Sequence, residues 1–73
     1  MSKIATQIAE TLLVSYAGQT VDTDTLIDRI DVEYRAARKR PAAVSSYFDV
    51  LAEVERRGAE LGAPGWRAFP TAA

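Results

Sequence analysis

Four positively charged residues within six positions are the strongest chemical signal in the sequence; they are Arg35, Arg38, Lys39 and Arg40. Guanidinium and ammonium groups at this density can neutralise the phosphates of a nucleic-acid backbone. The same charges also suit the C-terminal end of a helix, where they meet the negative end of the helix dipole. The 35–40 cluster therefore indicates either a site for a polyanion or a solvated helix end.

Further candidate donors follow this cluster. Ser45 and Ser46 could donate hydrogen bonds to phosphates or base edges, although serines in this position also cap helices. Arg67 could enter a minor groove, and we expect its neighbour Trp66 to cover the core, because the chain has few large apolar residues. The candidate nucleic-acid-binding residues are thus Arg35, Arg38, Lys39, Arg40, Ser45, Ser46 and Arg67.

The 73 residues include no His and no Cys. Zinc fingers, disulfides, cysteine nucleophiles and histidine general bases are therefore excluded. Asp22, Asp24 and Asp28 lack the glycine and the final glutamate of a calcium loop, so they are best explained as charges at a helix start. No glycine-rich phosphate loop or paired catalytic carboxylates are visible, and we expect no enzyme activity, metal or cofactor.

The net charge of −1 conceals an uneven distribution. Residues 1–34 contain two Lys or Arg against six Asp or Glu, whereas residues 35–73 contain seven against four. Such asymmetry suggests one face that meets an acidic partner, or simply the self-complementary surface of a small soluble domain.

The length predicts a single domain over residues 1–70, followed by a frayed tail at 71–73. A core of this size contributes only about 3–5 kcal/mol, so oligomerisation would help stability. The apolar positions near the N-terminus are interrupted by Gln7 and Glu10, which argues against a signal peptide. We expect a cytoplasmic protein without a membrane partner.

Three helices must position the candidate residues. The first covers residues 2–16, with Ser2 as its cap and an apolar residue every fourth position; Gly18 ends it, and residues 18–21 form a connection. The second begins at residues 22–25. It either stops near Asp31 or runs to Lys39, where it would end because Arg40 precedes a proline. The apolar sides of these helices consist of Ile4, Ile8, Leu12, Tyr16, Ala5, Ala9 and Leu13 in the first, and Leu26, Ile27, Ile30, Tyr34 and Ala37 in the second.

The third helix begins at or after Pro41, and Ser46 with Asp49 has the spacing of a capping box. Its exposed face carries Asp49 and Glu53, and Gly58 ends it. Two short segments, 59–61 and 66–69, flank a Gly/Pro turn and predict a β-hairpin. The apolar side of the helix consists of Val44, Tyr47, Phe48, Leu51, Ala52 and Val54.

The segment from Val44-Ser45 through the apolar positions Phe48, Leu51 and Val54 to Arg57-Gly58 resembles the third helix and first wing strand of winged helix-turn-helix domains. The resemblance covers about residues 21–70. It implies a mainly α, three-helix winged-helix-like fold with a small C-terminal β-hairpin. It also implies a DNA-binding transcriptional regulator with a recognition helix at about 42–57, acting as a homodimer because one short module makes few contacts.

A second class of function stays open on the residues alone. Asp49 and Glu53 on the third helix would repel phosphate, and the first half of the chain is acidic. These features suit a small protein-binding inhibitor or adaptor, of the kind that viruses and mobile elements encode. A purely structural helical oligomer is a third possibility.

Overall fold

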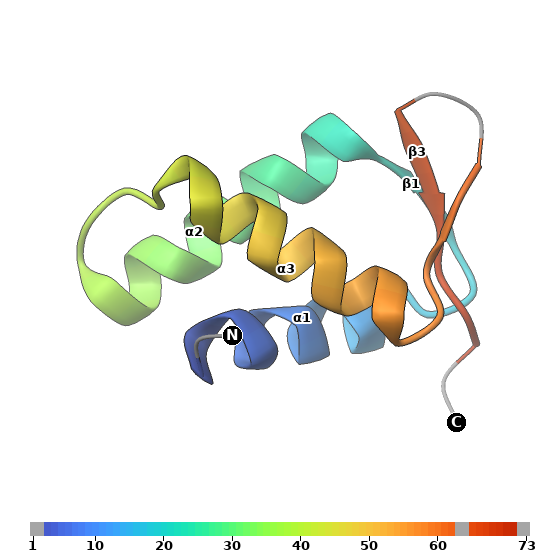
Figure 1. Cartoon of the computed structure of the whole chain (residues 1–73), viewed down its shortest axis with the longest axis horizontal. Helices are drawn as coiled ribbons and strands as arrows, with labels where there is room; N and C mark the ends of the chain where they lie inside the picture. Colours follow the sequence, from blue (N-terminus) through green and yellow to red (C-terminus); the bar gives the residue numbers. More distant parts are fainter. Residues whose placement is uncertain (1–2, 63–64, 72–73) are drawn as a thin grey trace.

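The computed structural model describes residues 3–62 and 65–71. The chain runs through α1 (Lys3–Ser15), β1 (Thr20–Asp22), α2 (Thr23–Arg38), α3 (Val44–Arg56), β2 (Glu60–Leu61) and β3 (Trp66–Ala68). Figure 1 shows the small sheet at one end of the helices and the α2–α3 connection at the other. The predicted mainly α fold with a C-terminal β-hairpin is confirmed, and its layout is compatible with a winged-helix-like arrangement.

The core lies where α1 packs against α3 and α2. Leu12 of α1, Leu26 and Ile30 of α2, and Val50 and Val54 of α3 are fully buried. The spacing of four residues within α2 and within α3 places each of these two pairs on one side of its helix, so burial of these apolar side chains holds the helices together. The predicted apolar face of α1 is confirmed, since Ile4, Ile8 and Leu12 are buried along with both alanines between them.

The second helix begins and ends through different devices. Asp22 caps α2, because its carboxylate accepts a hydrogen bond from the backbone N–H of Thr25 at 2.7 Å. Of the two ends that the sequence left open, the later one is observed. The helix runs to Arg38, and Lys39 ends it with φ 60°, in the left-handed region. Ala37 is exposed rather than buried, because this end of α2 extends past the core.

The start of α3 differs from the predicted capping box. Ala43 occupies the cap position in extended conformation and offers no side-chain acceptor. Ser46 already lies in the first turn, where its N–H donates to the carbonyl oxygen of Ala43 at 2.9 Å. The capping-box interpretation of Ser46 and Asp49 is therefore wrong. The helix begins at Val44, two residues before Ser46, directly after the extended Ala43.

The buried face of α3 is also rotated from the prediction. Val44 and Phe48 were expected in the core but are 69% and 66% exposed. Val50, which was not on the predicted list, is fully buried, and Glu53 is only 4% exposed although it was placed on the solvent face. The reason is geometric: a helix can bury one side, and the side centred on Val50 and Val54 excludes Phe48.

The sheet contains a strand that was expected to be a connection. β1 pairs with β3, with Val21 opposite Arg67, and β2 pairs with β3 to form the predicted hairpin. Three residues are too few to show the alternation of a strand, and the partner of β1 lies far along the chain. Sequence periodicity therefore could not reveal it.

The aromatic cover of the core is Phe69 rather than Trp66. Phe69 is buried, and its ring centre lies 5.7 Å from that of Tyr16. Trp66 is exposed, because it is adjacent in the strand to Arg67, which faces inward toward α3, and neighbouring strand residues point to opposite faces. The prediction that Trp66 covers the core is thus wrong.

Some sequence predictions fall on residues 1–2, 63–64 and 72–73, which lie outside the described residues. These include Ser2 as a helix cap, the centre of the Gly/Pro turn of the hairpin and the end of the tail. Within the described part of the chain, no helix combines the length and apolar character needed to cross a bilayer.

We expect Ala43→Ser to raise the free energy of unfolding by about 1 kcal/mol. Ala43 has the extended backbone of a cap residue, and a serine hydroxyl there would accept a hydrogen bond from the first turn of α3. Urea denaturation of both proteins measures this difference. Ala36→Ser, at an exposed position within α2, is the control and should lose stability slightly. No gain from Ala43→Ser would contradict the cap assignment.

Candidate nucleic-acid interface

Most arginine side chains of this protein are neutralised by a carboxylate of the same chain. Five ion pairs account for five of the nine Lys and Arg residues. Two of the pairs lie within α2 and one within α3; the other two join elements distant in sequence. The pairs are Arg29–Glu33, Arg35–Asp31, Arg56–Glu53, Arg57–Glu10 and Arg67–Glu55.

Three consecutive cations lack such a partner. Arg38, Lys39 and Arg40, here called the basic triad, are exposed and have no carboxylate within 4.0 Å among the described residues. They occupy the end of α2 and the connection to α3. Lys3, at the start of α1, is likewise without an ion pair in the described part of the chain. The positive charge of the basic triad is therefore not balanced locally.

Arg35 and Ser46 lie beside the basic triad but already have partners. The Nε of Arg35 donates to the Asp31 carboxylate at 2.7 Å. Ser46 hydrogen-bonds with the hydroxyl of Tyr34, and this contact, followed by one with Arg40, lowers the pKa of Tyr34. Ser45 is exposed. The structure thus brings Arg35, the triad and both serines to one end of the molecule.

Arg67 belongs to a different place. Its guanidinium donates to Glu55 at 3.2 Å and to the hydroxyl of Thr23 at 2.9 Å, and its side chain is 13% exposed. In Figure 1 its strand, β3, lies at the end of the molecule opposite the α2–α3 connection. The 13 residues of α3 span about 20 Å between the two. Arg67 therefore stabilises the junction of sheet and helices, and we leave it out of the interface.

Asp31 holds the connection that carries the triad. One of its oxygens accepts from Arg35, and the other accepts from the backbone N–H of Ala42 at 3.4 Å. The hydrogen bond from Arg35 is the main cause that lowers the pKa of Asp31, with further contributions from Ala42 and Tyr47. A charged Asp31 thus links α2 to the segment just before α3.

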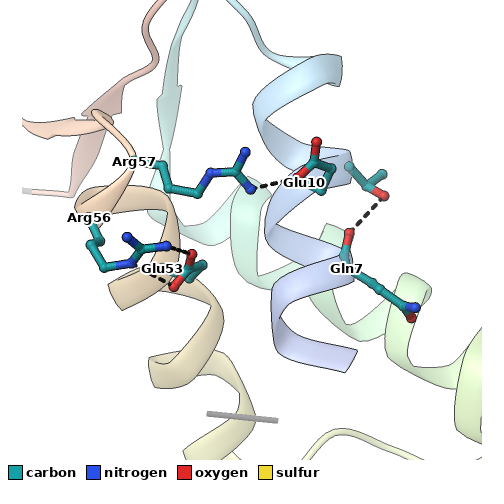
Figure 2. A network of polar contacts seen from close by, with 6 residues as sticks. Gln7, Glu10, Glu53, Arg56 and Arg57 are labelled. Atoms are coloured by element: carbon teal, nitrogen blue, oxygen red, sulfur yellow. Dashed lines mark hydrogen bonds and ion pairs between the residues drawn. The ribbon is translucent and has the colours of Figure 1, made fainter. Parts of the chain in front are cut away.

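The carboxylates of α3 affect this interface unequally. Figure 2 shows Glu53 turned toward Arg56, whose Nε donates to it at 3.1 Å, while Arg57 reaches across to Glu10 of α1 at 2.6 Å. Glu53 is therefore both buried and neutralised, and it does not oppose an anion at the surface. Asp49 is exposed and has no ion pair within the described residues.

The exposed side of α3 is more apolar than the sequence analysis expected. Val44, Phe48 and Ala52, here called the exposed stripe, follow one another at intervals of four and all face solvent. Ser45 and Asp49 lie beside them. The four-residue spacing of Val44, Phe48 and Ala52 is visible in the sequence, but it does not show that this side faces solvent. This side is exposed because α3 buries the apolar series through Val50 and Val54 instead.

No metal centre emerges from the described residues, in which no three Asp, Glu, His or Cys side chains gather in a group that could hold an ion. Asp22, the first of the three aspartates near the start of α2, is occupied as a helix cap.

Comparison of the chain with protein-family models, curated proteins and solved structures finds no match.

We expect Glu53→Gln to weaken the dependence of stability on acid pH. The hydrogen bond from Arg56 lowers the pKa of Glu53 below its usual 4.5. A lowered carboxyl pKa stabilises the fold above the unfolded pKa, and this contribution is lost as pH falls through the folded pKa. Glu53→Gln should therefore be less stable than wild type near neutral pH, and this difference should shrink below about pH 4.

Urea denaturation at a series of pH values measures this effect. Glu60→Gln is the matched control, because Glu60 is exposed and makes no ion pair in the described part of the chain. If Glu53→Gln and wild type lost stability in parallel, the ion pair of Glu53 with Arg56 would not contribute to acid sensitivity.

Proposed function

We propose that this protein is a small DNA-binding transcriptional regulator, in which the basic triad contacts the phosphate backbone and α3 enters the major groove. The observation that carries the proposal is that Arg38, Lys39 and Arg40 have no carboxylate partner among the described residues, whereas each of the other arginines forms an ion pair. The predicted winged-helix-like layout supports the same assignment.

Local charge balance decides which cations can serve a nucleic acid. A paired arginine must give up its carboxylate before it binds a phosphate, and that carboxylate then repels the DNA. An unpaired arginine or lysine simply replaces the counterions of the phosphates, which drives binding. The acidic overall pI of about 5.2 is therefore compatible with a basic contact surface at one end of the molecule.

The conformation of Lys39 supports a role for its charge. Lys39 ends α2 in the left-handed region, where glycine is the residue that costs least. A lysine there costs roughly 1 kcal/mol of backbone strain. Strain of this kind is often found at functional positions, and the benefit that we assign to Lys39 is a phosphate contact.

The start of α3 suits a position next to the DNA backbone. Ala43 offers no side-chain acceptor to the backbone N–H groups of Val44 and Ser45, the first two of α3. Together with the adjacent triad they favour an anion. A helix about 10–12 Å across fits a major groove about 12 Å wide.

We further propose that the protein acts as a homodimer in the cytoplasm. A single module that contacts the DNA backbone through three cationic side chains makes few contacts, and two copies on adjacent half-sites would raise the affinity. Light scattering with and without duplex DNA reports the number of copies.

A second candidate function is a protein-binding inhibitor or adaptor. The exposure of Val44 and Phe48 favours it, because large apolar side chains at a surface often contact another protein. Native purification separates the two candidates. Co-purifying nucleic acid with a high 260/280 absorbance ratio supports the first, and a stoichiometric protein partner without nucleic acid supports the second.

We expect Arg38→Ala/Arg40→Ala to bind random duplex DNA at least about tenfold more weakly at 0.1 M salt. Loss of two phosphate contacts should also make the plot of log affinity against log salt concentration shallower by about 2. Fluorescence polarisation of a labelled duplex measures both quantities.

Arg29→Gln/Arg57→Gln is the matched control, because it changes the net charge equally at two paired arginines. It should leave the salt dependence nearly unchanged. If the two double variants lost DNA affinity equally, net charge alone would govern binding. If the wild-type protein did not bind duplex DNA at low salt, the proposal would be wrong.

We expect Lys39→Gly to change stability and DNA affinity in opposite directions. The free energy of unfolding should rise by about 0.5–1 kcal/mol, because glycine adopts the left-handed conformation without strain. Affinity for duplex DNA should fall, because one phosphate contact is lost. Urea denaturation and polarisation on the same preparations test both, and unchanged affinity would remove Lys39 from the interface.

A further inference from the structure

We propose that α3 reads pyrimidines in the major groove, with the exposed stripe contacting thymine methyl groups and Asp49 accepting a hydrogen bond from the cytosine amino group. This inference rests on the proposed DNA-binding function and names the bases that the site would select. It follows from the side chains that α3 presents and from those that it lacks.

The usual readers of purines are missing from this surface. Arginine or lysine recognises guanine, and asparagine or glutamine recognises adenine, through paired hydrogen bonds in the major groove. The sequence of α3 contains no Lys, Asn or Gln, and its one arginine, Arg56, is paired with Glu53 near the far end of the helix. The helix therefore has no free side chain that could make these contacts.

The exposed stripe offers apolar contacts at regular spacing. Val44, Phe48 and Ala52 follow each other by four residues, which places them about 6 Å apart along one side of the helix. The thymine methyl is the one apolar group that a Watson–Crick base pair presents in the major groove. Three exposed apolar side chains on a helix in the groove would thus favour thymine.

Asp49 supplies the polar half of this recognition. It is exposed and makes no ion pair among the described residues, so its oxygens are available as acceptors. In the major groove, cytosine presents an amino group that can donate a hydrogen bond to a carboxylate. The basic triad, four residues or more before Val44, would hold the phosphates at the start of α3 while Asp49 faces the bases.

The charge of the neighbouring surface favours DNA over a protein on this stripe. The stripe comprises three side chains, interrupted on one side by Ser45 and Asp49, whereas a stable protein interface covers about 800 Å² on each partner. The basic triad ends four residues before Val44, in the connection that leads into α3. DNA offers phosphates to the basic triad and thymine methyl groups in the major groove to the exposed stripe, so it matches both parts of this surface.

The experiment selects binding sites from a random duplex library and then replaces thymine by deoxyuridine in the selected site. Deoxyuridine pairs identically but lacks the methyl group. We expect selected sites rich in T and C on one strand, and an affinity about fourfold lower for each contacted methyl that is removed.

Variants connect each contact to its residue. Val44→Ala should reduce the difference between thymine and deoxyuridine sites, whereas Val14→Ala and Val32→Ala, at other exposed valines in α1 and α2, should not. Asp49→Asn should change the preferred base from cytosine to adenine at one position, because asparagine pairs with adenine. Asp28→Asn, another exposed aspartate, is its control.

Each outcome distinguishes this inference from the proposed function. Binding that does not depend on the methyl group or on Val44 overturns the pyrimidine inference and leaves DNA binding intact. No binding to any duplex overturns both. If Val44→Ala instead abolishes self-association or capture of a protein partner, with DNA affinity unchanged, the stripe is a protein interface and the inference is wrong.

Discussion

The packing of α3 against α1 and α2 is the constraint on which the rest of this structure depends. Val50 and Val54 are fully buried together with Leu12 of α1 and Leu26 of α2. Because a helix buries one side, this choice also determines which side chains of α3 face solvent. The exposed stripe and Asp49 are thus consequences of core packing, and the proposed reading surface has the orientation that the core imposes.

Electrostatics acts on this scaffold through pairing rather than through total charge. The net charge is −1, yet the carboxylates are distributed so that they neutralise Arg29 and Arg35 of α2, Arg56 of α3 and Arg67 of β3. Exposed pairs of this kind contribute little to stability individually. Their distribution leaves the basic triad without an ion pair among the described residues, so positive charge is concentrated at one end of the molecule.

The α2–α3 connection combines two features that cost stability. Lys39 has a left-handed backbone and Ala43 provides no cap for α3. Asp31 compensates in part, because it binds both Arg35 and the backbone of Ala42. This connection is strained, anchored and positively charged, and it joins the proposed backbone contact directly to the proposed reading helix.

The sequence by itself determined the number of helices, the start of the second helix within residues 22–25, the C-terminal hairpin and the position of the basic cluster. These features depend on local periodicity, capping chemistry and turn residues, which act over a few neighbouring positions. Tertiary structure alone decided that residues 20–22 form a strand, that Glu53 is buried while Phe48 is exposed, and that Arg67 binds Glu55. Each of these outcomes depends on a partner distant in the chain or on which of two apolar sides of one helix is buried. Neighbouring residues in the sequence determine neither the distant partner nor the buried side.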